Sequence, residues 1–337
     1  MNLSNIKQNM LRERADKLPD VTDEMWSEVN EENRHIFNEY FESNQQLSKK
    51  SMTQYRSGLK QFFWWAKVRC KNKPLYELKK KDFIKYRSFL INHGLASSSL
   101  SFKKSAVSSL CNFIENVYCE EDDNYESFRN FTRGLPAIPK NKVYDKIKVS
   151  KEEYEDMMQV LEEQEHYLGM AWLATAFNIG ARRAELIQFK TEILDYEKHS
   201  NSKGEIQNYR FSHTVRGKGM GRDGKPLKFM INDEAIKYMK LWVEKRGYEH
   251  EYIFTTSRGE YKPISEGWAN EFCTNHLSII AGRRINPHLF KSSCITYLLE
   301  QGKDIKTVSK YIAHHNDVST TQIYDLRSDE DERDGIY

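Results

Sequence analysis

The chain has few cysteines and no long apolar run, and both shortages exclude classes of protein. Its five cysteines are odd in number and form no CxxC pair, which argues against a disulfide framework and a zinc site. The first residues lack the apolar segment of a signal peptide, and no run approaches the roughly 20 apolar residues that span a bilayer. We therefore expect a protein of the reducing cytoplasm, with no metal and no membrane partner.

The net charge of +3 conceals a strong asymmetry along the chain. Residues 1–45 carry 5 basic and 10 acidic side chains, whereas residues 46–148 carry 21 basic and 9 acidic ones. Residues 149–324 are balanced, and the tail beyond them is acidic. A basic segment is often only a solvated surface, but an excess of this size favours a polyanionic partner, above all nucleic acid.

Apolar periodicity divides the chain into predicted domains. Apolar residues at helical spacing within 51–70, 82–94 and 97–118 predict a small helical bundle. Thr22 is a candidate cap of an earlier helix, and Ser150 with Glu153 forms a capping box that opens a second domain. Residues 209–232 predict a strand, a glycine-rich turn and a strand. We predict an acidic helical extension (1–45), a helical DNA-binding domain (46–135), a basic linker (136–149), a mixed α/β domain (150–328) and an acidic tail (329–337).

The glycine-rich turn matches part of a nucleotide-binding motif but does not complete it. Gly219, Gly224 and Lys225 fit the start of a phosphate-binding P-loop, but Pro226 stands where that loop needs serine or threonine to hold magnesium. A β-hairpin turn that presents Lys218 is the better interpretation.

The remaining motifs are also ordinary when each is taken singly. His288 three residues before Lys291 suits a helix surface, and Arg182 three residues before Glu185 is a common helical ion pair. In order, however, the motifs read GARRAEL, GKG, HLFK and HHNDVSTTQIY. This ordered set resembles the tyrosine recombinase (phage integrase) family, which has GxRxxEL, a hairpin lysine, HxxR, and a histidine nine residues before a tyrosine.

The resemblance covers roughly residues 46–328 and implies a fold and a partner. The expected fold is mainly α with a mixed α/β C-terminal domain, in which a helical core-binding (SAM-like) domain and a catalytic-type domain clamp DNA. The expected partner is double-stranded DNA with a specific site, on which the protein self-associates as a dimer or tetramer. No cofactor is expected, because the bond energy of the cut DNA is retained in a 3′-phosphotyrosine.

The resemblance also implies a role for each matching residue. Fixed donors must meet the charge that a phosphodiester gains in its transition state, and a tyrosine reacts only once its proton is handled. The implied set is Arg182 and Lys291 at the two phosphate-binding positions, Lys218 as proton donor to the leaving 5′ oxygen, His288 in proton transfer, His315 on the scissile phosphate, and Tyr324 as nucleophile. Candidate DNA contacts in the basic segment and linker are Lys49, Lys50, Arg56, Lys103, Lys104, Lys140, Lys142, Lys146 and Lys148.

Two departures from the family pattern leave the activity open. Lys291 replaces an arginine, and a lysine offers phosphate a point charge in place of a planar fork. His314 replaces a glycine, which would take a turn that histidine resists. One hypothesis is a DNA-binding protein with impaired strand exchange that acts as a phage repressor. The other is an active site-specific recombinase, and a type IB topoisomerase fits less well.

Overall fold

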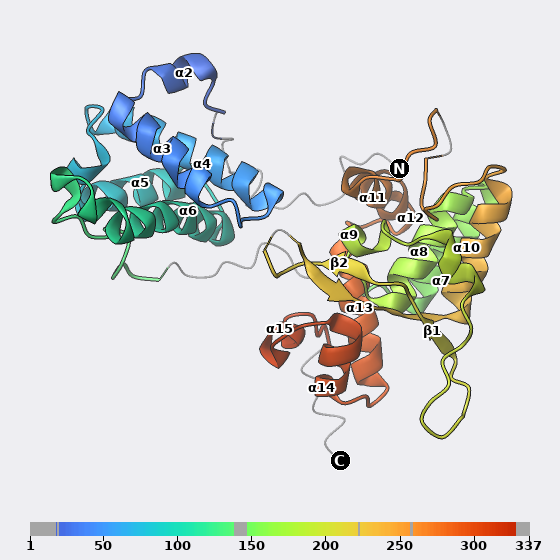
Figure 1. The fold of residues 1–337 in the computed structure, drawn as a ribbon. Coiled ribbons are helices and arrows are strands. Elements are labelled where there is room, and N and C mark those ends of the chain that lie inside the picture. The colour runs from blue at the N-terminus through green and yellow to red at the C-terminus, as the bar shows by residue number, and fades with distance from the viewer. Residues whose placement is uncertain (1–17, 19, 138–146, 222, 257–258, 328–337) are drawn as a thin grey trace. The chain divides into compact units, whose positions relative to one another are not determined.

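The computed structural model describes residues 18, 20–137, 147–221, 223–256 and 259–327, which form two compact units (Figure 1). The N-terminal unit holds the described residues up to 137, and the C-terminal unit most of those from 147 onward. One unit is helical and the other is mixed α/β, so the predicted fold class is confirmed. Among the described residues, no helix is long and apolar enough to cross a membrane.

The N-terminal unit is a helical bundle. The predicted cap of its first helix is present, since the amide of Met25 donates to Thr22 Oγ1. Short 3-10 turns connect the longer helices or follow the last of them. The elements are α2 (Asp23–Ser27), α3 (Glu31–Ser43), α4 (Lys49–Arg69), η2 (Leu75–Glu77), α5 (Lys80–Asn92), α6 (Ser97–Asn116), η3 (Tyr118–Glu120) and η4 (Asp123–Tyr125).

Aromatic side chains fill the core of this bundle. Phe62 and Phe63 of α4 are buried at the helical spacing that the sequence shows, and Phe62 packs edge-on against Tyr86 of α5. The predicted boundary at residue 45 follows the charge pattern, but the packing continues across it. Phe37 and Phe41 of α3 are buried in the same core as α4 to α6.

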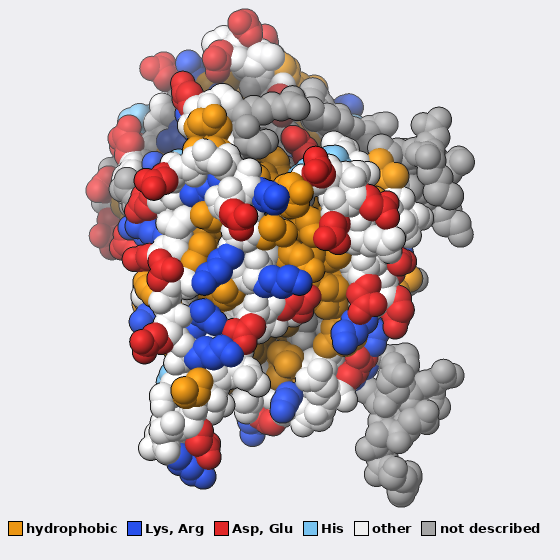
Figure 2. Space-filling model, turned by 90° about the vertical axis from the view of Figure 1, so that its right-hand side faces the viewer, with side chains coloured by type: hydrophobic (Ala, Val, Ile, Leu, Met, Phe, Trp, Pro, Cys, Tyr) orange, Lys and Arg blue, Asp and Glu red, His pale blue; other side chains and the backbone are white. Residues whose placement is uncertain are grey.

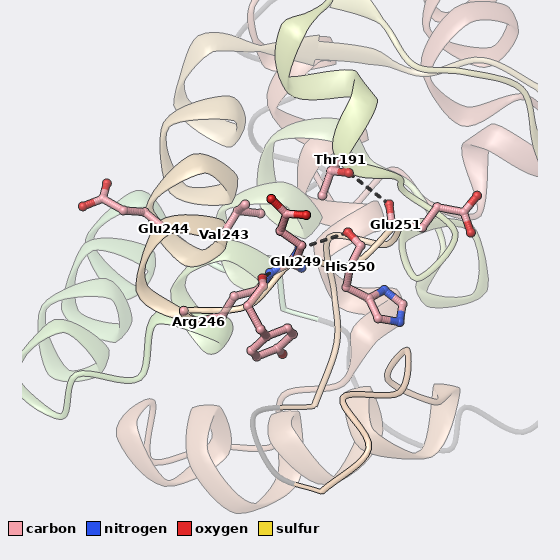
Figure 3. A pocket seen from close by; sticks show the side chains of 9 residues that line it. Thr191, Val243, Glu244, Arg246, Glu249, His250 and Glu251 are labelled. Carbon is pink, nitrogen blue, oxygen red and sulfur yellow. Dashed lines mark hydrogen bonds between the residues drawn. The ribbon is translucent and has the colours of Figure 1, made fainter.

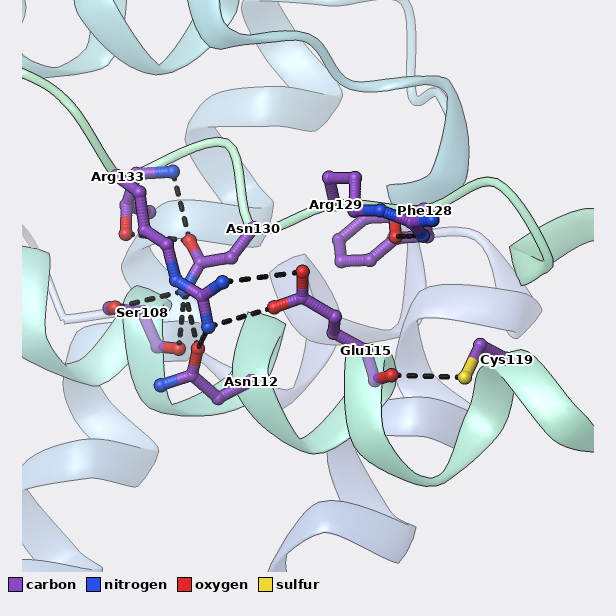
Figure 4. A network of polar contacts seen from close by, with 9 residues as sticks. Ser108, Asn112, Glu115, Cys119, Phe128, Arg129, Asn130 and Arg133 are labelled. Atoms are coloured by element: carbon purple, nitrogen blue, oxygen red, sulfur yellow. Dashed lines mark hydrogen bonds and ion pairs between the residues drawn. The ribbon is translucent and has the colours of Figure 1, made fainter.

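A polar network fastens the last loop of the bundle to α6 (Figure 4). The amide nitrogen of Asn130 donates to Asn112 Oδ1 at 2.7 Å and to the Ser108 carbonyl at 3.2 Å. Arg133 bonds the same Asn112 oxygen and pairs with Glu115 at 2.8 Å. The network therefore holds the loop without any buried, unpaired charge.

The C-terminal unit begins at the predicted capping box, where Ser150 and Glu153 bond each other's backbone amides. Its helix α8 lies at the centre and packs against α7, α10 and α13 (Figure 1). The elements are α7 (Lys151–Glu163), α8 (Tyr167–Ile179), α9 (Arg183–Leu186), η5 (Thr191–Asp195), β1 (Tyr209–Phe211), β2 (Val215–Gly217), β3 (Lys225–Leu227), β4 (Met230–Asn232), α10 (Asp233–Lys245), α11 (Glu266–Phe272), η6 (Cys273–Leu277), α12 (Ser278–Ile280), α13 (Pro287–Glu300), α14 (Ile305–Val308), η7 (Ser309–Ala313) and α15 (Val318–Gln322); η6 and η7 are π-helical turns.

The strand–turn–strand prediction is confirmed as a hairpin in two sections. β1 pairs with β4 and β2 with β3, both antiparallel, so that Gly217 faces Lys225. A Cβ at Gly217 would lie 2.3 Å from Leu227 Cδ1 and 3.4 Å from Glu185 Oε1. Glycine is therefore required where this hairpin approaches α9.

Candidate active site

The residue after α8 places the first arginine of the site. Gly180 ends α8 in the left-handed conformation, and Arg182 becomes the cap of α9. Glu185 bonds the Arg182 amide at 2.7 Å and its guanidinium at 2.9 Å. Glu185 is buried at 1% exposure, so its carboxylate depends on this pairing. Glu185 thus fixes Arg182 in place, a role that the sequence alone did not assign to it.

The second arginine of the GARRAEL motif has a structural contact. Arg183 Nε lies 3.0 Å from Glu266 Oε2, and its Nη1 donates to Asn270 Oδ1. Both partners belong to α11. Arg183 therefore joins α9 to α11, and Arg182 is left as the arginine of the site.

Helix α13 carries the two residues of the HLFK motif one turn apart. His288 lies exposed in the first turn, after Pro287 at the helix start. Lys291 is fully buried, and its Nζ donates to the Ala313 carbonyl at 2.8 Å. Burial, followed by the charge of Arg182, lowers the pKa of Lys291 to about 7 against the opposing effect of Glu185.

The turn after η7 brings the paired histidines to the same place. His314 adopts φ 53° and ψ 35°, so the left-handed turn forms even with histidine where the family has glycine. The His315 amide donates to the Ser309 carbonyl, and its Nδ1 lies 2.9 Å from Thr321 Oγ1. Burial, followed by the charge of Lys291, lowers the pKa of both imidazoles to about 4. Both rings are therefore neutral at pH 7.

Tyr324 follows α15 directly and lies beside His315. The two ring centroids are 4.9 Å apart, and Lys291 Nζ is 6.0 Å from the centre of the Tyr324 ring. The ring is half-buried against the small apolar cluster of Ile295, Leu299, Val308 and Ala313. Within the described part of the chain, its hydroxyl has no hydrogen-bond partner. The Tyr324 ring is thus half-buried at the edge of this cluster and is not a fully buried core side chain.

The hairpin contributes a lysine that sequence reasoning passed over. Lys218, the predicted one, is exposed at the end of β2 and contacts none of the other described site residues. Lys225 of β3 reaches the turn instead, with Nζ 2.6 Å from Asn316 Oδ1 and 3.4 Å from the His314 carbonyl. In the sequence, Lys225 is recognisable only as part of the incomplete P-loop motif. Which strand of the hairpin faces the turn depends on how the strands pair, and the sequence alone does not give that pairing.

The candidate DNA contacts of the N-terminal unit differ in how exposed their side chains are. Lys49, Lys50 and Arg56 are exposed on α4, and the Arg56 guanidinium lies 4.2 Å from the Phe41 ring centre. Lys103 is half-buried against Gln61 Oε1, and burial lowers its pKa. Lys104 is its half-buried neighbour on α6.

The predicted linker lysines are described only in part. Lys148 pairs with Glu300 on the C-terminal unit, whereas Lys140, Lys142 and Lys146 lie outside the described residues. Figure 2 shows a face on which acidic and basic side chains are interspersed, as the balanced charge of residues 149–324 implies. The basic excess therefore belongs to the segment before residue 149.

Metal binding and small-molecule binding are two alternative roles for the described residues. Among the described residues, no three His, Cys, Asp or Glu side chains are grouped to hold a metal ion. A shallow depression of about 810 Å³ lies where α10 ends, between Thr191 and Glu251 (Figure 3). Arg246 donates there to the carbonyls of His250, Tyr252 and Ile253, so its guanidinium is used within the protein, while the carboxylates of Glu244 and Glu249 also line the depression.

The fold and this cluster define a protein class, and comparison with known proteins agrees. The phage integrase family matches residues 148–331, and the N-terminal SAM-like domain of phage integrases matches residues 35–116. The chain belongs to the phage integrase, or tyrosine recombinase, family.

Individual relatives extend over nearly the whole chain. The SPbeta prophage-derived recombinase-like protein YomM of Bacillus subtilis is 58% identical over 335 residues, 98% of either chain. The tyrosine recombinase XerC of Staphylococcus carnosus is 26% identical and covers 82% of this chain and 86% of its own. In fold, the chain is similar to the XerH site-specific recombinase bound to a palindromic difH substrate, with a TM-score of 0.64, 15% identity, and coverage of 95% and 97%. The Tn1549 transposon integrase with circular intermediate DNA gives 0.64 at 14% identity, covering 90% of this chain and 99% of the integrase.

Proposed function

We propose that the chain binds double-stranded DNA at a specific site and that strand exchange through Tyr324 is impaired at Lys291. One observation carries this proposal. Arg182, His315 and Tyr324 gather in one place, but the buried ammonium of Lys291 is directed to the Ala313 carbonyl. The phosphate would thus meet one fewer fixed donor than the family pattern provides.

The chemistry assigned to the site is a transesterification. The Tyr324 hydroxyl attacks the scissile phosphorus and loses its proton. A 3′-phosphotyrosine bond forms while the bond to the 5′ oxygen breaks. Lys218 protonates that leaving oxygen and His288 takes part in the proton transfer. Neither metal nor ATP enters this scheme, because one phosphoester replaces another.

The tautomer of His315 suits it to the phosphate. If the Thr321 hydroxyl donates to Nδ1, the neutral ring carries its proton on Nε2. That Nε2 is buried and has no partner among the described residues. It is therefore free to donate to a non-bridging oxygen, beside the guanidinium of Arg182.

The size of the impairment follows from analogous sites. Loss of one preorganised transition-state donor lowers a rate by about 10²–10³. DNA binding draws on many phosphate contacts and loses little from one of them. A chain that binds DNA well and cuts it slowly suits a repressor, and the prophage origin of its relative YomM agrees with a phage regulator.

An active recombinase is the second candidate. The Tyr324 ring lies next to His315, its hydroxyl has no hydrogen-bond partner among the described residues, and the XerC relative is named a tyrosine recombinase. The decisive experiment first maps the bound site by sequencing DNA recovered with the chain from its host. A nicked suicide substrate with that site then traps any covalent adduct. Rapid and complete adduct formation would establish the active recombinase and refute the impairment.

The substitution Lys291→Arg tests where the impairment lies. An arginine can keep one donor on the Ala313 carbonyl and direct others to phosphate, because its fork carries five N–H groups. We expect a rise in the adduct rate of up to about 10²-fold, with DNA affinity nearly unchanged. An unchanged adduct rate would place the defect elsewhere.

The basic segment is assigned to phosphate binding. Replacing Lys140, Lys142, Lys146 and Lys148 together should weaken binding to every sequence and flatten its salt dependence by about 0.9 for each lost phosphate contact. The matched control replaces Lys237, Lys240 and Lys245 on α10, which are exposed but lie outside the basic segment. Equal salt slopes for both variants would contradict the assignment. Footprint length on the mapped site tests the self-association expected on DNA.

A further inference from the structure

The helix that precedes His315 ends in an unusual way. η7 stops at Ala313, and His314 turns left-handed with φ 53°. Such a conformation is unfavourable for a residue with a Cβ and is usually left to glycine. The last carbonyls of a helix are also short of donors and carry partial negative charge. Within the segment the His315 amide donates to the Ser309 carbonyl, so the Ala313 and His314 carbonyls are the ones that must find donors elsewhere.

Two lysines from different elements meet these carbonyls. Lys291 of α13 donates to the Ala313 carbonyl at 2.8 Å, and Lys225 of β3 lies 3.4 Å from the next carbonyl, that of His314. Lys225 also donates to Asn316 Oδ1 at 2.6 Å. Helix α13 and the hairpin therefore each contribute one lysine to the two carbonyls of this turn.

The side chain of His314 adds a third restraint. Its ring packs edge-on against Phe229, with centroids 4.8 Å apart, between strands β3 and β4. Lys291 is inaccessible to solvent, so its removal would leave the Ala313 carbonyl without this donor. The conformation of the turn also fixes the position of His315, whose ring contacts Thr321 and Tyr324.

We propose that Lys291 is a positioning residue that, together with Lys225, clamps the left-handed turn at His314 and so holds His315 against Tyr324. The proposal deepens the proposed function and rests on it for its consequence in catalysis. It also relates the two departures from the family pattern. A lysine at position 291 supplies the donor that a histidine at position 314 needs in order to stay left-handed.

The test uses the full-length chain without DNA. Nuclear Overhauser contacts between the rings of His315 and Tyr324 report the position of His315, and the ¹⁵N shift of His315 Nδ1 reports its bond to Thr321. We expect Lys291→Met to abolish the ring contact and to shift the Nδ1 signal. Adding His314→Gly should restore both, because glycine adopts the turn without the clamp.

Rescue by His314→Gly distinguishes an effect on the position of His315 from an effect of the lost Lys291 charge. Loss of the Lys291 charge persists in the double variant, so a purely electrostatic effect on His315 would persist with it. Lys225→Met is the second probe, for use if Lys291→Met does not fold, and it should weaken the same contact. The matched control is Lys228→Met, an exposed lysine on the same hairpin with no described contact, which should change nothing.

Two outcomes would overturn the proposal. One is a ring contact that survives in Lys291→Met, or in Lys225→Met where the first variant does not fold. The other is a lost contact that His314→Gly fails to restore. A failure of the proposed function is seen separately, as absence of DNA binding by the unaltered chain, and leaves these DNA-free measurements valid.

Discussion

The two units treat charge in opposite ways. Among the described residues, the N-terminal unit buries no Lys, Arg, Asp or Glu, although its residues 46–137 carry 17 basic and 8 acidic side chains. The C-terminal unit has balanced charge but buries Glu185 and Lys291. Buried charges cost stability unless they are paired, and shifted pKa values gather where chemistry is done. The exposed charges of the N-terminal unit therefore indicate a binding surface, whereas the buried charges of the C-terminal unit indicate a reactive site.

The largest expected effect distinguishes DNA binding from the covalent reaction. Tyr324→Phe removes only the hydroxyl, which has no partner among the described residues, so stability should change by about 1 kcal/mol or less. Any covalent adduct on a suicide substrate should disappear, while a gel shift should show unchanged DNA binding. An adduct that persists in the Phe variant would move the nucleophile to another residue. Loss of folding or of DNA binding would make Tyr324 structural.

The next prediction tests the cost of disturbing a buried charge. Glu185→Ala leaves Arg182 without its partner and α9 without its capping carboxylate, so we expect a loss of about 3–5 kcal/mol in unfolding free energy. The matched control in the N-terminal unit is Glu77→Ala, which breaks an exposed ion pair with Lys73 and should cost less than about 1 kcal/mol. Equal losses in urea titrations of the two variants would remove the contrast between the units.

Much of the fold could be predicted because its signals are local. The caps at Thr22 and Ser150 need only residues three positions away, and both are confirmed. The aromatic helices and the hairpin likewise follow from periodicity and glycines. The family was also predicted from the sequence, since four motifs in a fixed order carry it.

The contacts of the site could not be predicted, because they join distant segments. Lys291 and Ala313 are 22 positions apart, and Lys225 and His314 are 89. The sequence indicated that His314 resists a left-handed turn, but tertiary packing overrides that local preference. The spacing of Arg182 and Glu185 predicts an ordinary helical ion pair, but it cannot show that Glu185 is buried.

Acid and alkali should act on the C-terminal unit through different groups. His314 and His315 have folded pKa values near 4 and ordinary values of 6.5, so the unfolded chain binds more protons between these limits. Stability should therefore fall as pH drops from about 6.5 to 4. Lys291, at about 7 against 10.5, likewise makes the unfolded chain bind more protons, and its contribution rises between pH 7 and 10.5.

Hydrogen exchange measured separately for helices α13 and α4 would check this dependence. Protection of α13 should decline below pH 6.5 more steeply than that of α4, after correction for the intrinsic exchange rate. The variant His314→Gly should reduce the acid loss, because it removes one of the two imidazoles. Parallel declines in both helices would show that the histidines do not control the acid response.

The smallest expected effect on stability compares two hydroxyl groups, that of the buried Thr321 and that of the half-buried Ser109. Thr321→Val removes the partner of His315 Nδ1, and Ser109→Ala removes the partner of the Tyr40 hydroxyl at 2.8 Å in the N-terminal unit. Each variant should lose about 1 kcal/mol, the usual contribution of one hydrogen bond. Only Thr321→Val should also lower the adduct rate on a suicide substrate, by roughly 10-fold or more, since the tautomer of His315 is then no longer fixed. If Ser109→Ala lowered that rate as much, the effect would come from stability, and Thr321 would have no part in orienting the imidazole.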